Sequence, residues 1–342
     1  MPTSHLIICR TDHIGDAVVT LPLIGYLKRK YPHMTIGFLC RSYVAPIAQH
    51  CRSVDYVIEA DQITDPVSAL AHTGADSILF FPTSERKWIK AAKKAGIQMR
   101  IGTQHKLSHW FYCTHRTRFK RSNTQLHETQ LSFQLLAPLG ISAIPTLKEI
   151  AQLHHLEAPP YLGAFLLEKT HFNLILHPKS HGNGREWPIQ HYVALVNALA
   201  QYKNIHCWIT GSEKEGIELE KQTPELFNPA NTSNLCGKLS LTELLSFINT
   251  ADGLIASGTG PLHISAALGK PTLGLFPPIA PINPTRWAPL GARAEFLCQK
   301  TLCESCENND ACLCMLAITP EQVAEVVLRW VNLKFSVHSL LL

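Results

Sequence analysis

Residues 6–28 read LIICRTDHIGDAVVTLPLIGYLK, and this stretch sets the class of fold. The apolar run at residues 6–9 predicts a buried β-strand, and the apolar spacing of residues 17–31 predicts a helix with Pro22 in its first turns. The loop between them contains Gly15, which permits a tight turn. A buried strand that leads through a short loop into a helix is the repeating unit of a parallel sheet covered by helices.

The same alternation continues along the chain and breaks once, at residues 149–170, where Pro159–Pro160 and Gly163 predict a segment between domains. Further strands are predicted at residues 35–39, 56–58, 77–81, 174–177, 206–210, 253–256 and 272–276. We therefore expect an α/β protein with two doubly wound domains, at residues 1–155 and 170–318, and a final helix within residues 319–342. Two such domains leave a cleft, and ligands bind such sheets at the carboxyl ends of the strands.

The composition is that of a folded protein. The chain has 342 residues, of which 46% are hydrophobic and 17% charged, and these values exclude intrinsic disorder. The apolar run at residues 6–9 is too short for a signal peptide, and the longest uncharged stretch, residues 129–147, contains Gln, Pro and Gly. We therefore expect a cytoplasmic protein without a membrane span.

Positive charge is concentrated in one region. Residues 86–121 contain 11 of the 31 Lys and Arg residues and no Asp or Glu, so the rest of the chain has 20 basic and 26 acidic residues. The region also contains Trp88, Trp110, Phe111 and Tyr112. It fits single-stranded nucleic acid, with aromatic rings stacked on bases, or a phosphorylated lipid at an anionic membrane. A solvated helix face is the plain alternative, which 11 uncompensated charges make less favourable.

The loop RTDHIGD, Arg10 to Asp16, follows the first strand. Asp16 lies at the start of the next helix, where a carboxylate can accept a proton from an attacking hydroxyl. Asp is also a favoured N-cap residue, so Asp16 has a purely structural interpretation as well. Asp12 is a second carboxylate in this loop, and it has Arg10 as a possible partner.

Two later loops also connect a strand to a helix. HPKSHGNGREWP, residues 177–188, offers cations, a hydroxyl and exposed backbone N–H groups that suit a diphosphate, although an ordinary polar loop fits as well. ASGTGPLH, residues 256–263, has glycines before Pro261 and presents a helix N-terminus to an anion. His263 lies in the first turn of that helix, as a ligand contact or as a structural residue.

Five cysteines, at positions 298, 303, 306, 312 and 314, form a cluster. Cys303, Cys306, Cys312 and Cys314 could form a structural zinc site, but the C-x-C spacing is awkward for chelation. Reduced thiols or a redox-labile disulfide remain the alternatives.

Taken in order, these stretches resemble glycosyltransferase family 9, the ADP-heptose:lipopolysaccharide heptosyltransferases. The similar stretches are residues 10–28, 95–102 (AGIQMRIG), His127–Glu128 with the Leu139–Gly140 that follows, REWP, 241–245 (LTELL), 258–276, and the cysteine cluster followed by MLAITPEQV. The resemblance implies a GT-B fold and an inverting, metal-independent transfer from a nucleotide sugar, with no cofactor for catalysis. It also implies that the C-terminal helix packs back on the N-terminal domain.

The resemblance further implies roles for individual residues. Asp16 would be the catalytic base. The donor nucleotide would be held by Lys179, Ser180, Arg185, Ser212, Thr259, Gly260 and His263. A phosphorylated acceptor, lipid A–Kdo or its heptosylated form, would be held by Arg10, Asp12, Arg86, Lys87, Lys90, Arg118 and Arg121. The partners expected are therefore ADP-heptose, a phosphorylated glycolipid and the inner face of the inner membrane, without nucleic acid.

One position departs from the family pattern. The family has Asp immediately before the Thr/Ser-Gly of its third motif, near the donor sugar, and this chain has Gly258 there. The departure keeps two alternatives open: a GT-B transferase that uses another nucleotide sugar, and a catalytically silent relative that binds lipid or nucleic acid.

Overall fold

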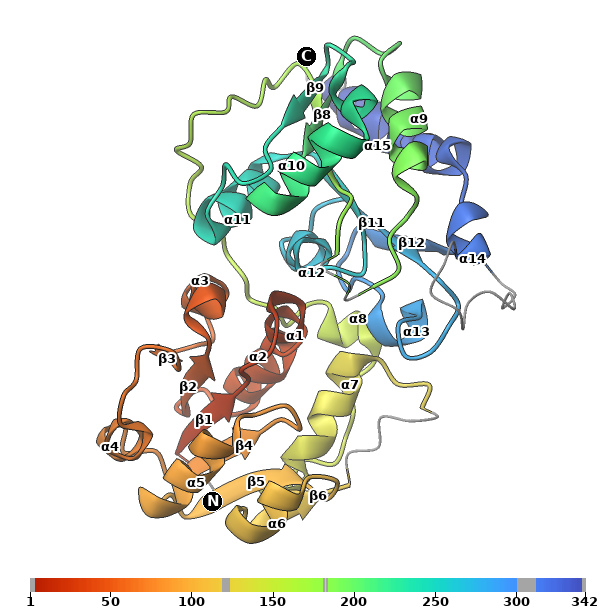
Figure 1. Cartoon of the computed structure of the whole chain (residues 1–342). Helices are drawn as coiled ribbons and strands as arrows, with labels where there is room; N and C mark the ends of the chain where they lie inside the picture. Colours follow the sequence, from red (N-terminus) through yellow and green to blue (C-terminus); the bar gives the residue numbers. More distant parts are fainter. Residues whose placement is uncertain (1–3, 119–123, 181, 183, 300–311, 340–342) are drawn as a thin grey trace. The chain divides into compact units, whose positions relative to one another are not determined.

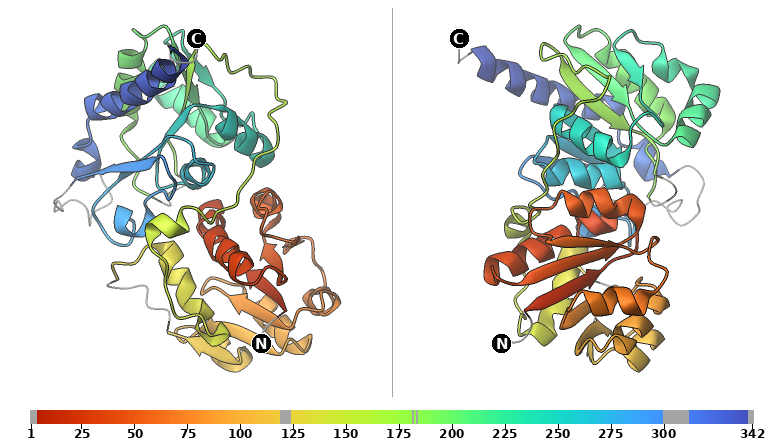
Figure 2. Two further views of the ribbon diagram at one scale, coloured as in Figure 1. Left: turned by 180° about the vertical axis from the view of Figure 1, so that it is seen from behind. Right: turned by 90° about the vertical axis from the view of Figure 1, so that its left-hand side faces the viewer.

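The computed structural model describes residues 4–118, 124–180, 182, 184–299 and 312–339 (Figure 1). The chain divides into two compact units, residues 1–157 (unit 1) and 158–342 (unit 2), and each contains one six-stranded sheet. Every pair of neighbouring strands described in these sheets is parallel. Two parallel sheets with helices on their faces confirm the predicted α/β class (Figure 2).

Unit 1 has the strand order β3-β2-β1-β4-β5-β6. Its strands are β1 (His5–Cys9), β2 (Thr35–Cys40), β3 (Tyr56–Glu59), β4 (Ser77–Phe80), β5 (Met99–Thr103) and β6 (His115–Thr117). Its α-helices are α1 (Ile14–Val18), α2 (Leu21–Lys30), α3 (Ala45–Gln49), α4 (Pro66–His72), α5 (Arg86–Lys94), α6 (Leu107–Tyr112), α7 (Glu128–Phe133) and α8 (Leu147–Ile150).

Unit 2 repeats this order as β12-β11-β10-β7-β8-β9. Its strands are β7 (Phe172–His177), β8 (Ile205–Ile209), β9 (Thr232–Asn234), β10 (Gly253–Ser257), β11 (Thr272–Phe276) and β12 (Ala294–Cys298). Its α-helices are α9 (Ile189–Leu199), α10 (Glu213–Gln222), α11 (Leu241–Thr250), α12 (Gly260–Ala267), α13 (Pro284–Trp287), α14 (Leu313–Leu316) and α15 (Pro320–Ser339).

The strand order places one switch point in each sheet. In unit 1 the chain runs outward in one direction from β1 and in the other from β4, and these two strands are neighbours, with Cys9 beside Phe80. In unit 2 the corresponding neighbours are β7 and β10, with His177 beside Ala256. Loops that leave the carboxyl ends of such a strand pair diverge and leave room for a ligand. The predicted loops follow β1, β7 and β10, which are three of these four strands.

The helix predicted at residues 17–31 is two helices in the structure. α1 ends at Val18, and α2 begins at Leu21 with Pro22 in its first turn. Proline has no N–H to donate to the preceding turn, and its ring fits best at the start of a helix, so Pro22 begins a new helix. The break shortens α1 to five residues and leaves Asp16 in its first turn.

The last helix, α15, packs within unit 2. It lies beside α9 (Figure 2), and Val323, Val327 and Trp330 enter the core of that unit. Lys334 donates to Asp252 Oδ2 at 2.7 Å. These contacts bury the apolar face of α15 within unit 2, and the expected packing of this helix on the N-terminal domain stays a prediction. Within the described residues, no helix combines the length and apolar character needed to cross a membrane.

Candidate active site

The loop after β1 surrounds one buried cation. The Arg10 side chain is 2% exposed, and its guanidinium pairs with Asp16 Oδ1, with Asp12 Oδ2 at 3.2 Å and with Glu128 Oε1 at 3.8 Å. The guanidinium carbon lies 4.2 Å from the centre of the Phe81 ring. Burial acts to lower the pKa of Arg10, but the three carboxylates outweigh it and raise the pKa. Arg10 is therefore a buried counter-ion of three carboxylates, and its contact with the acceptor stays a prediction.

Asp16 is the member of this cluster nearest to solvent. Its side chain is 16% exposed, whereas the Glu128 side chain is fully buried. The N-cap of α1 is His13 and not Asp16, so the capping interpretation of Asp16 does not hold. Asp16 lies in the first turn, where its negative charge is favoured by the helix dipole and its orientation is fixed by Arg10. The structure thus presents one carboxylate oriented by a buried cation.

The loop after β4 joins the same cluster. The Thr83 hydroxyl donates to both carboxylate oxygens of Asp12 at 2.6 Å, and the Tyr43 hydroxyl donates to the Asp12 carbonyl at 2.9 Å. Lys106, at the start of α6, donates to the Ser84 carbonyl at 2.9 Å and to the Pro82 carbonyl at 2.5 Å. Burial lowers the pKa of Lys106, while the charge of Asp12 opposes the shift. The cluster therefore lies at the switch point of β1 and β4.

In unit 2, the loop after β7 is held by its own charges. The Lys179 ammonium pairs with Glu186 at 3.4 Å and with Glu218 at 3.2 Å. Burial acts to lower the pKa of Lys179, but the two glutamates outweigh it and raise the pKa. The Ser180 backbone N–H donates to Glu186 Oε1 at 2.8 Å, and its hydroxyl donates to the Gly184 carbonyl at 3.0 Å. Lys179 and Ser180, both predicted to bind the donor nucleotide, therefore brace the loop.

The loops after β7 and β10 meet at two glycines. A Cβ atom added to Gly184 would lie 3.3 Å from the carbonyl oxygen of Gly258, so this approach favours glycine. A second contact joins the same two loops, because the backbone N–H of Trp187 donates to Ser257 Oγ at 3.1 Å. Arg185 lies between these two contacts. The structure therefore brings the two predicted donor loops together at the switch point of unit 2.

The N-terminus of α12 carries an unpaired polar group. The Thr259 residue is 8% exposed, and its hydroxyl has no hydrogen-bond partner among the described residues. Thr259 is the N-cap of α12, but its side chain makes no capping bond. Gly260 and Pro261 follow in the first turn, where helix N–H groups point outward. A buried hydroxyl beside a helix N-terminus suits an anionic ligand that accepts from both.

His263 and Ser212 make contacts that stabilise the fold. His263 is buried in α12, and its ring centre lies 6.1 Å from that of Trp287. Ser212 is the N-cap of α10, where its hydroxyl donates to Glu215 Oε2 at 2.9 Å and accepts from the Glu215 N–H at 3.3 Å. This capping box accounts for Ser212 without a ligand.

The predicted acceptor cations lie apart from the buried cluster. Arg86, Lys87 and Lys90 are exposed on α5, and Arg118 is exposed just after β6. Arg121 lies outside the described residues. The cations therefore form a surface, whereas Arg10 and Asp12 are interior.

The predicted cysteine site is only partly within the described residues. Cys303 and Cys306 fall outside them, Cys314 is buried in α14, and Cys312 is half-buried as its N-cap. Among the residues that the structure describes, no three His, Cys, Asp or Glu side chains are grouped to hold a metal ion.

Sequence reasoning missed five residues of these clusters. They are Thr83, Lys106, Glu128, Glu186 and Glu218. Glu186 lies in the same loop as Lys179, within REWP, and the other four come from other loops or helices. Glu128 had one signal, because it lies in a stretch that resembles the family, but nothing in its neighbourhood connects it to Arg10.

Comparison with known proteins agrees with this arrangement. Residues 88–314 match the model of glycosyltransferase family 9 (heptosyltransferase). A Haemophilus influenzae protein, named provisionally as a glycosyltransferase, is 24% identical over 83% of this chain and 86% of its own length. The solved structure of E. coli ADP-heptose lps heptosyltransferase II covers 96% of this chain and 98% of its own, with a TM-score of 0.75 and 19% identity.

A second solved structure, E. coli heptosyltransferase WaaC with ADP, covers 95% of this chain and 99% of its own, with a TM-score of 0.68 and 17% identity. These likenesses show the fold, a GT-B fold with two Rossmann-like domains. The family match covers well over half of the chain. The chain therefore belongs to glycosyltransferase family 9, the heptosyltransferase family, and is a glycosyltransferase.

Proposed function

We propose that this protein transfers a heptose from ADP-heptose to the inner core of lipopolysaccharide, either lipid A–Kdo or its heptosylated form. The transfer inverts the anomeric centre and needs no metal. The acceptor binds to unit 1 and the nucleotide sugar to unit 2. The observation that carries the proposal is the oriented Asp16 carboxylate, the most exposed group of an otherwise buried charge cluster at a switch point.

In this mechanism Asp16 takes the proton from an acceptor hydroxyl. The oxygen of that hydroxyl then forms a bond to the anomeric carbon of the heptose, and the bond from this carbon to the ADP oxygen breaks with its electron pair going to ADP. Arg10 keeps Asp16 oriented, and the Arg10–Glu128 pair anchors the guanidinium in the core. A base that is held in the right place before the reaction gives a larger rate acceleration than one that must first be oriented.

The donor site would use the N-terminus of α12. The Thr259 hydroxyl and the backbone N–H of Gly260 would donate to the diphosphate, and Arg185 and Lys179 would balance the charge that develops on the leaving ADP. The Thr259 hydroxyl supports this placement, because it is buried and has no hydrogen-bond partner within residues 4–118, 124–180, 182, 184–299 and 312–339. The E. coli heptosyltransferase WaaC, a protein with the same fold, was solved with ADP, which supports a nucleotide as the ligand but does not locate its diphosphate. Ser180 and His263 are proposed to shape the same site.

The acceptor would reach unit 1 as a phosphorylated glycolipid at the inner face of the inner membrane. The exposed cations Arg86, Lys87, Lys90 and Arg118 support this proposal, because lipid and sugar phosphates bind such surfaces. Asp12 and Arg10 would act on the acceptor only through the placement of Asp16 and its loop.

A second candidate donor follows from Gly258. A Cβ atom at this position would lie 3.3 Å from Phe276 Cε1, so the position accepts a side chain only if Phe276 yields slightly. Because position 258 is glycine, the carboxylate that the family has near the donor sugar is absent. A different nucleotide sugar is therefore the alternative to ADP-heptose.

A thermal-shift titration with ADP, UDP, GDP and CDP tests the donor. A ligand at about 100 times its dissociation constant stabilises the fold by about 2.7 kcal/mol. A selective response to ADP is the expected result and would justify a heptosyl-transfer assay. A selective response to UDP or GDP would replace the donor, and no response to any nucleotide would contradict the proposal in favour of a silent relative.

A further inference from the structure

The helix α6 turns an apolar face outward. Leu107, Trp110 and Phe111 have the spacing i, i+3, i+4, so they share one side of the helix. Their exposed fractions are 72%, 56% and 64%. The opposite side is fixed to the sheet by a buried polar residue, because the Thr103 N–H donates to His109 Nδ1 at 2.7 Å. Single exposed apolar residues are ordinary, but three on one short helix form a patch that requires a partner.

A cationic surface borders this patch. The helix α5 buries Trp88 and Ile89 and exposes its lysines, and Lys90 and Lys93 have their ammonium groups 5.9 and 5.8 Å from the centre of the Tyr112 ring, at the end of α6. On the other side, the guanidinium carbon of Arg116 lies 4.6 Å from the centre of the Trp110 ring. Residues 86–121 contain no Asp or Glu, although Glu85, the N-cap of α5, pairs with Lys87 at 3.2 Å. The cations next to the patch, Lys90, Lys93 and Arg116, contact its aromatic rings or Tyr112.

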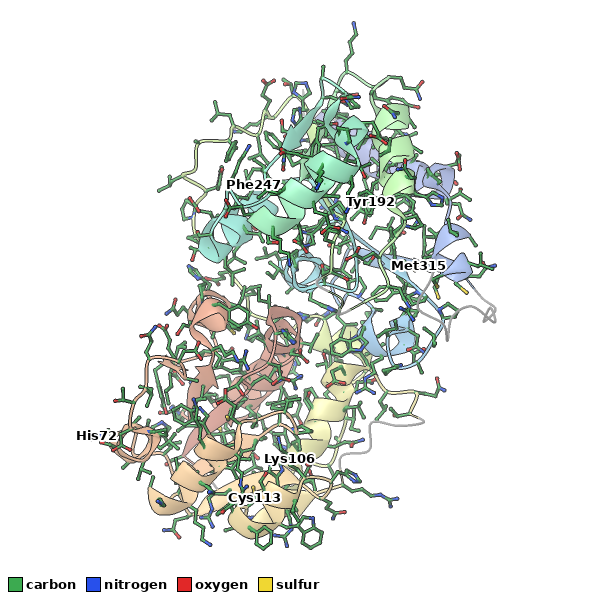
Figure 3. All side chains as sticks on the ribbon, in the orientation of Figure 1. His72, Lys106, Cys113, Tyr192, Phe247 and Met315 are labelled. Carbon is green, nitrogen blue, oxygen red and sulfur yellow. The ribbon has the colours of Figure 1, made fainter. Side chains whose placement is uncertain are left out.

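The patch is also connected to the candidate active site. Figure 3 labels Lys106 and Cys113, which flank α6 in the sequence. Lys106 donates to the Ser84 carbonyl at 2.9 Å, in the loop where the Thr83 hydroxyl donates to Asp12. A surface that binds α6 therefore lies next to the loop that orders the acidic cluster.

We propose that the α6 patch, with the lysines of α5 and Arg116, docks on an anionic lipid bilayer. Leu107, Trp110 and Phe111 enter the boundary between headgroups and acyl chains, and the cations bind lipid phosphates. The complementarity of charge supports this partner. Nucleic acid fits less well, because Arg116 covers a face of the Trp110 ring on which a base would stack. The inference rests on the proposed function in one respect, namely that the acceptor there is a membrane glycolipid.

Co-sedimentation of the purified full chain with vesicles tests the inference. The vesicles are phosphatidylcholine alone, or phosphatidylcholine with 30% phosphatidylglycerol as the anionic lipid. We expect binding to the anionic vesicles and little to the neutral ones. The triple variant Leu107→Ser/Trp110→Ser/Phe111→Ser is expected to bind at least about tenfold more weakly. The variant Lys93→Glu/Lys94→Glu is expected to lose about fivefold or more for each cation, with a marked dependence on salt.

Two controls make the result specific. Leu162→Ser/Leu166→Ser removes two exposed apolar residues from unit 2 and should leave vesicle binding unchanged. The ADP thermal shift of each variant reports whether unit 2 is intact, so a protein that binds vesicles through α6 but no ADP would contradict the proposed function and not this surface. Three results would overturn the surface. The wild type fails to bind anionic vesicles, or the triple variant binds them as the wild type does. The third is that the triple variant keeps vesicle binding and loses only the binding of a single-stranded oligonucleotide, measured in parallel.

Discussion

The two switch points have the same strand order and opposite chemistry. In unit 1, the loops after β1 and β4 close around Arg10, whose charge is matched by three carboxylates in a buried cluster. In unit 2, the loops after β7 and β10 meet at glycines, and the buried Thr259 hydroxyl has no hydrogen-bond partner in the part of the chain that the structure describes. The first site pairs its buried charges with one another and presents one oriented carboxylate, while the second has a buried hydroxyl at a helix N-terminus.

This difference shows how one topology supports two roles. The strands set where the loops diverge, and the loop residues decide what happens there. A buried ion cluster is suited to holding a base in one place, since moving any member leaves another charge unpaired. A glycine turn at a helix N-terminus is suited to an anion, since backbone N–H groups can approach it closely. Substitutions in unit 1 should therefore act mainly on stability, whereas substitutions at the glycine turn of unit 2 should act mainly on ligand affinity.

The largest effect is expected from Arg10→Ala. Removing this cation takes away the one charge that pairs with Asp12, Asp16 and Glu128 in a buried cluster, so the free energy of unfolding should fall by about 3–5 kcal/mol. Chemical denaturation measures this change. The control is Arg52→Ala, which breaks the exposed pair of Arg52 with Glu157 and should cost no more than about 1 kcal/mol. Equal costs for the two variants would show that the cluster in unit 1 has no special weight.

Acid should weaken unit 1 through two buried histidines. Burial lowers the pKa of His109 to about 4 and that of His154 to about 4, both below the ordinary value of 6.5. The unfolded chain then binds more protons below pH 6.5, so the free energy of unfolding falls as the pH drops from about 6.5 to about 4, by up to about 3 kcal/mol for each residue.

Denaturation at a series of pH values checks this expectation. The variant His109→Gln/His154→Gln should flatten the profile in that window, whereas His72→Gln, at an exposed site, should not. A double variant with the slope of the wild type would show that other groups cause the acid sensitivity.

Thr259→Val should affect binding and not stability. The change replaces a hydroxyl that has no described partner, so the free energy of unfolding without ligand should change by less than about 1 kcal/mol or increase. If the hydroxyl donates to the diphosphate, ADP affinity should fall about tenfold, which isothermal titration calorimetry measures. An unchanged ADP affinity with lowered stability would mean that the hydroxyl serves the fold.

Ser212→Ala should show the reverse pattern, with the smallest effect. Its hydroxyl completes the capping box of α10, so its loss should lower the free energy of unfolding by about 1 kcal/mol. We expect ADP affinity to stay within twofold of the wild type, as measured by the same titration. A tenfold loss of affinity would return Ser212 to the donor-binding residues.

The sequence was sufficient for the parallel sheets and for the loops that carry the sites, because a strand, a glycine loop and a helix leave a local pattern. It was not sufficient for the partners of those loops. Glu128 and Thr83 reach Arg10 and Asp12 across more than 70 residues of chain, and Glu218 reaches Lys179 across 39 residues. Such pairs depend on tertiary packing and leave no local spacing to recognise. Four strands escaped prediction. β6 and β9 have only three residues each. β5 (MRIGT) and β12 (AEFLC) have five residues each, but a charged residue interrupts the apolar run of both.

The most direct test of the central claim is the turnover of Asp16→Asn with ADP-heptose and a lipopolysaccharide acceptor, measured together with its affinity for ADP. If Asp16 is the base of unit 1 and the donor binds only unit 2, turnover should fall about 10²–10⁴-fold while ADP affinity stays near that of the wild type. Asp55→Asn, which removes a carboxylate paired with Lys28 elsewhere in unit 1, should keep normal turnover. Normal turnover in Asp16→Asn would contradict the account.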